Sequence, residues 1–468
     1  MILLKKKFKF SDQITFALFS GDHNPMHIDE IISRRLIYGQ TLVHGVNLVL
    51  TILESWAKIS KEKFSLSSIN VNFINPVFLN KEIEVIYDST KNYFELISNN
   101  KTCLKLSFKL SDNSNPDQSS FNLIDNYPRN KKPKNIDIES INGTEGFIDF
   151  YLHESCFENF YPNLKLFSNW FQISSMLATT RIVGMECPGL NSIFTGFNLD
   201  FKSDKTKPRY KVNKVNRFGQ ISIQVYGKFQ GTINSLFRPE PIDQPKFNEI
   251  KQSVKPREFK KHSTLIIGGS RGLGEVTAKI LAAGGAEVMI TYNKGKDDAL
   301  KVINDINTSG GSARMLHFDI NLDIKKQFLM NDFIPTDIFY FATPSILPGI
   351  KGSFSKDLFN KYSFFYVSIF YDLVTYWNSK GVLNFMYPSS VYVDSPEDNM
   401  LEYSLAKQSG ENLSNMLMNK FEEITIYTPR LPRLETDQTT TILPSENSSS
   451  SKNMLSCVRE FVSHKKRE

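Results

Sequence analysis

The sequence contains few cysteines for its length, with only Cys103, Cys156, Cys187 and Cys457 among 468 residues. They are widely spaced and form no Cys-x-x-Cys pair, which argues against a disulfide framework and against a zinc site. We therefore expect no metal, and the cytoplasm is the default location.

Long apolar runs are also missing. No stretch of about 18 apolar residues occurs, so no membrane-spanning helix is expected. The first residues, "MILLKKKFKF", place only three apolar residues before the lysines, which predicts a first strand and neither a signal peptide nor a membrane anchor.

The charge is mild. The chain has 56 basic and 49 acidic residues, a formal net charge of +7, without a long basic run. Nucleic acid is therefore not an expected partner. A small positive excess suits anionic small molecules such as nucleotides or phosphopantetheine carriers, although surface solubility explains it equally well.

The length predicts three domains, or two. Two polar stretches rich in Pro or Asn, beginning at Ser111 and at Phe237, have no sustained periodicity and are interpreted as linkers. They leave three parts, which we place at residues 1–115, 136–238 and 262–468.

The first two parts share an order of elements typical of an α+β fold, in which a sheet wraps a central helix. In the first part, Ser11 is expected to cap a helix reaching about Phe19, and a buried helix over 41–59 precedes strands near 68–78, 81–89, 93–99 and 103–110. The second part repeats the order weakly, with a helix over 164–184 and strands near 192–201, 210–219 and 220–229.

The third part alternates strands and helices from Ser263 onward, which is typical of an α/β fold with a doubly wound parallel sheet.

The loop "GDHNPMH", Gly21 to His27, concentrates groups that can move protons near neutral pH. Together with "TLVHG" from Thr41, it resembles the R-specific enoyl hydratase and MaoC-like dehydratase family, which has the hot-dog fold. The resemblance covers about residues 1–110, and "RIVGMECPGLNSIFTGFNLDF" extends it, as the second half of a double hot-dog, to about Phe237. The second half has no counterpart of the loop, so it is expected to be degenerate.

The resemblance implies roles for the loop residues. Asp22 and His27 would hold the catalytic water between them, and the backbone N–H of Gly45 would bind the thioester oxygen at a helix N-terminus. Asn24 would orient the loop, and Pro25 would fix its turn. The alternative is that Asp22 and Asn24 cap a turn, Asp29 caps the next helix and His27 is packed. His23 and His44 are given no role.

A second motif, "LIIGGSRGLGE", is a glycine-rich turn between a strand and a helix. Gly268, Gly272 and Gly274 allow the backbone to approach a pyrophosphate, whose charge the helix N-terminus favours. The alternative is a tight turn without a ligand.

Downstream, Tyr403 and Lys407 stand four residues apart, on one face of a helix, and Ser390 precedes the tyrosine by thirteen residues. With the glycine turn, this set resembles the short-chain dehydrogenase/reductase family over about Ser263 to Thr436, a Rossmann fold. By resemblance, Tyr403 acts as acid or base, Ser390 holds the substrate carbonyl and Lys407 supports the tyrosine. The alternative is an exposed helix pair.

The cofactor is predicted to be NADP(H), because no carboxylate follows the second strand to receive a ribose diol, whereas Arg271 and Lys294 could meet a 2′-phosphate. Asp319 matches the family's adenine-side aspartate. The expected cofactor-binding residues are Gly268, Ser270, Arg271, Gly272, Leu273, Gly274, Asn293, Lys294, Asp319, Ala342 and Lys407.

The sequence departs from that family at several points. Ile267 replaces the usual Thr, Phe341 to Thr343 replace an Asn-Asn-Ala-Gly strand end, and Tyr362 lies near the position of the family's catalytic Asn. No final strand with an Asp-Gly-Gly turn is found, so oligomer contacts through that strand are not assumed, and a homodimer stays open.

Both sites would act on position 3 of an acyl chain carried as a thioester of CoA or acyl carrier protein. We expect NADP-dependent 3-ketoacyl reduction and (R)-3-hydroxyacyl dehydration, or enoyl hydration in reverse. The alternatives are a reductase for another carbonyl substrate such as a sugar nucleotide, and a hot-dog part that only binds an acyl group or a partner chain.

Overall fold

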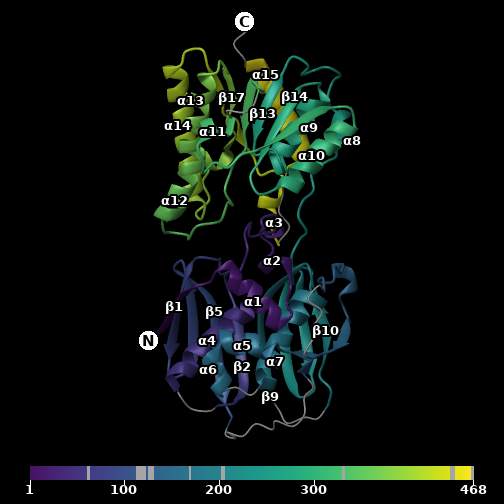
Figure 1. Ribbon diagram of the computed structural model, residues 1–468, viewed down its shortest axis with the longest axis vertical. Helices are drawn as coiled ribbons and strands as arrows, with labels where there is room; N and C mark the ends of the chain where they lie inside the picture. Colours follow the sequence, from purple (N-terminus) through teal and green to yellow (C-terminus); the bar gives the residue numbers. More distant parts are fainter. Residues whose placement is uncertain are drawn as a thin grey trace. The chain divides into compact units, whose positions relative to one another are not determined.

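The computed structural model describes residues 1–60, 64–111, 123–124, 131–167, 170–201, 206–328, 332–442 and 448–464. It divides into two compact units (Figure 1). One comprises Met1–Glu240 with Thr441–Pro444, and the other comprises Pro241–Thr440 with Ser445–Glu468. Most of the first predicted linker, residues 112–122 and 125–130, lies outside the described residues.

One antiparallel sheet runs through the whole first unit, in the strand order β1-β3-β4-β5-β2-β9-β12-β11-β10-β7. Its strands are β1 (Ile2–Lys7), β2 (Leu66–Phe73), β3 (Glu82–Asp88), β4 (Tyr93–Ser98), β5 (Lys101–Leu110), β7 (Glu145–Phe147), β9 (Ser192–Phe201), β10 (Arg209–Val215), β11 (Gln220–Tyr226) and β12 (Phe229–Phe237). The halves predicted as separate parts meet where β2 pairs with β9, with Val71 opposite Phe197. A short pair, β6 (Leu123–Ile124) with β8 (Phe150–Tyr151), lies outside this sheet.

The expected central helix of the first half is α4 (Gly45–Ser60), which buries ten of its residues. The second half has α7 (Trp170–Arg181), which runs into a π-helical segment, η2 (Ile182–Glu186). The other helical segments of this unit are α1 (Phe10–Ser20), α2 (Pro25–Ile28), α3 (Glu30–Ser33), η1 (Ile138–Ser140), α5 (Glu154–Phe160) and α6 (Pro162–Phe167).

One helix start was predicted wrongly. Ser11 lies inside α1, whose N-cap is Lys9. The Asp12 carboxylate accepts the Lys9 N–H and so caps the helix in place of Ser11. The helix ends at Gly21, whose φ of 75° is the left-handed conformation that glycine adopts at little cost. The chain then turns into the loop that carries Asp22.

The second unit holds a parallel sheet in the order β15-β14-β13-β16-β17-β19, which confirms the doubly wound α/β class. Its strands are β13 (Ser263–Ile267), β14 (Glu287–Tyr292), β15 (Ser312–His317), β16 (Asp337–Tyr340), β17 (Asn384–Met386) and β19 (Thr425–Tyr427). The strand order reverses between β13 and β16. Ligands of such sheets bind at that point, beyond the carboxyl ends of the strands.

Helices cover both faces of this sheet (Figure 1). One group contains α8 (Phe247–Lys251), α9 (Gly272–Ala283), α10 (Lys296–Thr308) and α15 (Ser450–His464). The other contains α11 (Ile324–Phe328), α12 (Lys356–Ser363), the π-helical η3 (Phe364–Ile369), α13 (Phe370–Asn378) and α14 (Leu401–Lys420). Short elements near the second site are β18 (Ser389–Ser390), η4 (Val391–Val393), β20 (Arg430–Leu431) and η5 (Asp437–Thr439).

The second predicted linker is only partly a linker. It forms α8, and Phe247, Ile250, Val254 and Phe259 are buried in the core around α9. These apolar residues are scattered among charged ones, so their shared core cannot be recognised from a short window. No described helix of the chain has the length and apolar character needed to cross a bilayer.

Candidate active sites

The loop after α1 is held by the side chain of Asn24. Its oxygen accepts the Met26 N–H at 3.1 Å and caps α2, with Pro25 at the first helical position. Its amide nitrogen donates to the carbonyls of Gly184 and Gly189 at 3.0 and 3.1 Å. Asn24 is 2% exposed. It therefore connects the loop to the second half of the sheet, a role beyond that of a turn cap.

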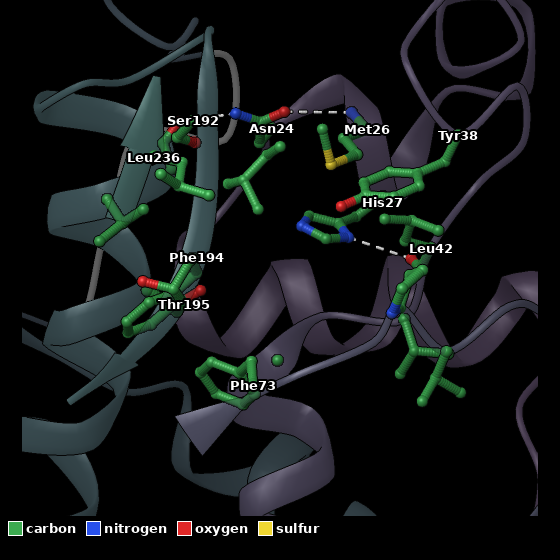
Figure 2. Close-up of a pocket in the computed structure, with 18 of the residues that line it drawn as sticks. Asn24, Met26, His27, Tyr38, Leu42, Phe73, Ser192, Phe194, Thr195 and Leu236 are labelled. Atoms are coloured by element: carbon green, nitrogen blue, oxygen red, sulfur yellow. Dashed lines mark hydrogen bonds between the residues drawn. The ribbon is translucent and has the colours of Figure 1, made fainter. Parts of the chain in front are cut away.

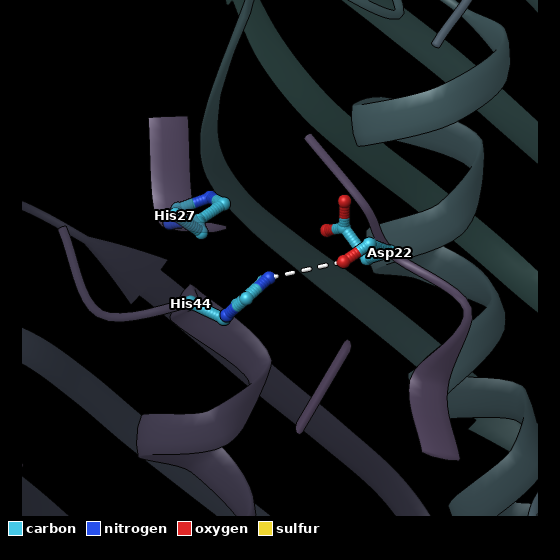
Figure 3. Close-up of side chains that lie close together, drawn as sticks. All are labelled: Asp22, His27 and His44. Atoms are coloured by element: carbon cyan, nitrogen blue, oxygen red, sulfur yellow. Dashed lines mark hydrogen bonds between the residues drawn. The ribbon is translucent and has the colours of Figure 1, made fainter. Parts of the chain in front are cut away.

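Asp22 and His27 face one another across a small gap (Figure 3). A carboxylate oxygen of Asp22 and a ring nitrogen of His27 lie within 4.8 Å. A water that makes hydrogen bonds of about 2.8 Å to both groups fits this separation. Asp22 is 2% exposed, and its Oδ1 accepts the Asn24 N–H at 3.1 Å.

The protonation of His27 follows from its neighbours. Its Nδ1 lies 3.0 Å from the carbonyl oxygen of Leu42, which can only accept, so Nδ1 carries the hydrogen and Nε2 has a lone pair. Burial lowers the pKa of His27, while the Asp22 charge opposes that effect. A neutral ring with one basic nitrogen is the form that a general base requires.

His44, to which the sequence assigned no role, is a buried neighbour of this pair. Its ring stacks on His27 with 4.0 Å between centroids, and its Nε2 lies 3.2 Å from the main-chain oxygen of Asp22 (Figure 3). Gln13 Oε1 accepts from the His44 main chain at 3.0 Å and lies 2.9 Å from Nδ1. Burial and His27 hold the pKa of His44 well below its usual range.

Among the described side chains, those placed near enough together to hold a metal ion are Asp22, His27 and His44. However, both His44 nitrogens and one His27 nitrogen already face oxygen atoms of the chain. These contacts leave few lone pairs for an ion, so the arrangement favours proton transfer.

A cavity of about 300 Å³ opens beside the pair. Figure 2 shows His27 on its wall with Tyr38 and Met26, while Phe73, Phe194 and Leu236 supply apolar surface. Gly45 lines the cavity at the start of α4, and no described residue accepts its N–H. An added Cβ at Gly45 would lie 2.9 Å from the Phe73 ring, so a side chain there would fill the cavity.

The predicted reductase residues gather at the carboxyl edge of the parallel sheet. Gly268 follows β13, Asn293 follows β14, Asp319 follows β15, Ala342 follows β16 and Ser390 follows β17. The glycine turn is tightly packed: Gly268 has a φ of 85°, and a Cβ at Gly274 would lie 2.3 Å from the Gly268 oxygen. Backbone N–H groups at the start of the twelve-residue α9 can therefore approach a pyrophosphate closely.

The expected 2′-phosphate ligands lie in different surroundings. Arg271 is the N-cap of α9, and its Nη1 lies 3.4 Å from Asp437 Oδ2, a carboxylate that also accepts the Ile242 N–H. Lys294 is exposed. Asp319 accepts two hydrogen bonds from Asn321, and these lower the pKa of Asp319. The competing carboxylate of Asp437 was not recognised from the sequence because 166 residues separate it from Arg271.

Ser390, Tyr403 and Lys407 are buried together, so the alternative of an exposed helix pair is wrong. Burial raises the pKa of Tyr403, and a side-chain hydrogen bond with Ser390 opposes the rise. Burial lowers the pKa of Lys407 to about 7, against the charge of Glu411. The tyrosine is therefore a proton donor at neutral pH, and Lys407 changes charge near pH 7.

Lys407 has an aromatic neighbour. Its Nζ donates to the Pro388 carbonyl at 2.7 Å and lies 3.9 Å from the centre of the Tyr366 ring, in η3. Tyr366 OH in turn lies 2.6 Å from Thr343 Oγ1. Tyr362, which the sequence placed near this point, bonds instead to the main chain of Leu347. The ring of Tyr366 thus contacts the ammonium group by a cation–π interaction.

Comparisons with known proteins match both regions. Residues 5–102 match the MaoC like domain, and residues 262–333 match the short chain dehydrogenase family. Among curated proteins, an uncharacterized oxidoreductase, YgfF of Escherichia coli (strain K12), is 42% identical over 57 residues, which are 12% of this chain and 23% of that protein. The chain thus spans about a quarter of the length of that relative.

Two solved structures illustrate the structural matches. The angucycline C-6 ketoreductase LanV with bound NADP is 14% identical, with a TM-score of 0.39, over 44% of this chain and 90% of that one. A short chain dehydrogenase from Burkholderia cenocepacia J2315 in complex with NADP is 18% identical, with a TM-score of 0.38, over 44% and 91%.

Proposed function

We propose, from the premise that this chain joins a MaoC-like domain to a short-chain dehydrogenase domain, that it is a bifunctional enzyme of acyl thioesters. The reductase site would convert a 3-ketoacyl thioester to the (R)-3-hydroxyacyl thioester. The other site would remove water to give the 2-enoyl thioester. On this proposal the first unit is a double hot-dog whose halves share the sheet through β2 and β9.

The observation that carries the dehydratase assignment is the Asp22–His27 pair on the wall of a cavity whose lining is largely apolar. A 3-hydroxyacyl group loses a proton from carbon 2 and a hydroxyl from carbon 3, so the site needs a base and an acid on one face. The neutral His27 would accept the carbon-2 proton, and the Asp22–His27 pair would return a proton to the hydroxyl, which leaves as water. The N–H of Gly45, on the cavity wall, would donate to the enolate oxygen.

The residues of the second site fit a dinucleotide. The glycine turn leaves no room for side chains at Gly274, and the start of α9 favours phosphate. When bound, NADPH would supply the hydride. Tyr403, protonated because it is buried, gives its proton to the carbonyl oxygen, and Ser390 holds that oxygen. NADP supports the reductive direction, because cells usually keep that cofactor reduced.

The test is an assay of the purified chain with NADPH and 3-ketoacyl thioesters of both CoA and acyl carrier protein, with crotonyl thioesters for the hydration step. We expect oxidation of NADPH and hydration of crotonyl thioester by the same protein. Absence of both activities on both carriers would refute the proposal, and activity on one carrier alone would identify the natural one.

Cofactor preference is expected to depend on Arg271. NADPH should bind at least about tenfold more tightly than NADH, or roughly 1.4 kcal/mol, because Arg271 and Lys294 favour the 2′-phosphate and no carboxylate follows β14. Arg271→Ala should remove most of this preference and leave NADH binding nearly unchanged in fluorescence titrations.

The Asp437 contact gives this prediction a second variant. Asp437→Asn removes the charge that competes for Arg271, so it should strengthen NADPH binding and leave NADH binding unchanged. Equal or tighter binding of NADH by the natural chain would contradict the NADP assignment and make hydration followed by oxidation the leading direction.

Cofactor binding should also depend on pH through Lys407, whose pKa in the cofactor-free protein is about 7. As the pH rises through this value, the ammonium loses its charge and no longer attracts the cofactor. We expect NADPH affinity to fall several-fold between about pH 6 and about pH 9, because the bound form takes up a proton. Lys407→Met should bind weakly with a flatter pH dependence, and an unchanged profile would exclude Lys407 as the titrating group.

A further inference from the structure

The second half of the first unit has no counterpart of the Asp22 loop, yet it contacts the Asp22 carboxylate directly. Thr180, in α7, is 3% exposed, and its hydroxyl donates to Asp22 Oδ2 at 2.5 Å. The sequence separation is 158 residues. Thr180 also lines the cavity.

Gly184, in η2, contacts the same carboxylate. A Cβ added to Gly184 would lie 2.5 Å from Asp22 Oδ1, closer than two non-bonded atoms can come. The carbonyl of Gly184 accepts from the amide of Asn24 at 3.0 Å. One turn of this helix and its π-helical continuation therefore enclose the carboxylate, with one donor and no side chain in the way.

We propose that Thr180 is a positioning residue for Asp22, so that the second half completes the dehydratase site and is more than a scaffold. The proposal rests on the dehydratase function proposed above. The Thr180 hydroxyl fixes Oδ2 and the Asn24 N–H fixes Oδ1, so the lone pairs that remain would be available to the catalytic water.

The Thr180 hydroxyl acts on the orientation of the Asp22 carboxylate, so its loss should slow the chemical step more than it weakens substrate binding. The effect should therefore appear in kcat more than in KM, and a side chain that keeps the hydroxyl should restore the rate.

The experiment compares Thr180→Val, which keeps the shape and removes the donor, with Thr180→Ser, which keeps the donor. For Thr180→Val we expect kcat/KM for crotonyl thioester hydration to fall by roughly ten- to a hundredfold, mainly through kcat. Thr180→Ser should recover most of the activity.

Thr179→Val is the matched control. Thr179 is the preceding residue of α7, is fully buried and donates to the Met176 carbonyl at 2.7 Å, away from Asp22. The Thr179→Val variant should hydrate crotonyl thioester at the rate of the natural chain. A loss of rate in Thr180→Val then cannot be ascribed to a buried valine in this helix. Should Thr180→Val not fold, Thr180→Ala removes the same donor without adding bulk and carries the same expectations.

Three results separate the possible failures. Hydration by the natural chain with an unchanged kcat in Thr180→Val or Thr180→Ala overturns the role of Thr180 and leaves the dehydratase assignment intact. An equal loss in Thr180→Ser and Thr180→Val also overturns it, because the donor would then not matter. No hydration by the natural chain refutes the dehydratase function itself.

Discussion

Asp22→Asn and His27→Ala should each lower hydration of crotonyl thioesters by on the order of a hundredfold or more, while ketoacyl reduction stays near its natural rate. Asn at position 22 keeps the size of the side chain but cannot accept a proton. Ala at position 27 removes the lone pair on Nε2 that the Leu42 contact leaves free. Initial rates on both substrates, measured on the same preparation, check the separation of the two activities.

His23→Ala is the control for these variants. His23 stands next to Asp22 in the same loop, and the residues that line the cavity do not include it. We expect it to hydrate crotonyl thioester nearly as well as the natural chain. Normal hydration in Asp22→Asn or in His27→Ala would remove that residue from the site, and the alternative of capping and packing roles would then stand.

Tyr403→Phe should lower ketoacyl reduction by about a hundredfold to ten-thousandfold with little change in NADPH binding. On the proposed function the phenol is the proton donor, whereas the glycine turn and Lys407 hold the cofactor. The loss should therefore be in kcat. Steady-state kinetics and cofactor fluorescence titration on the same preparation measure the two effects separately.

Tyr392→Phe is the matched control for this prediction. Its ring centre lies 6.3 Å from that of Tyr403, but its hydroxyl donates to Glu397 and not to the Ser390 side chain. Tyr392→Phe also removes one hydroxyl from this aromatic cluster, but it should leave the rate of ketoacyl reduction unchanged. If Tyr403→Phe lost binding and turnover equally, Tyr403 would be a structural residue.

Much of the fold could be predicted because its signals are local. The strands β3, β4 and β9 were placed to within a residue or two, since each has a regular apolar pattern between turn residues. The region between Pro344 and Val382 was not resolved into α12, η3 and α13, because aromatic and polar residues alternate there without one clear period.

The parts of both sites that were not predicted depend on contacts distant in sequence. Asp22, His27, Tyr403 and Lys407 stand in short motifs, whereas Thr180 and Tyr366 do not. A buried threonine or tyrosine is ordinary in a core, and only the tertiary fold puts these two against a carboxylate and an ammonium. Tyr366 lies in a π-helical segment, and Thr180 lies just before one. Such segments are rare in proteins overall but are often found at functional sites.

The pairing of β2 with β9 determines where the chain can be cut to express the two activities separately. Ile69 and Val71 of β2 lie between β5 on one side and β9 on the other. A fragment ending after Leu110 would leave β2 as a bare edge, with unpaired N–H and C=O groups that recruit other chains into aggregates. A cut after Phe237, where β12 already pairs on both sides, exposes no such edge at this seam.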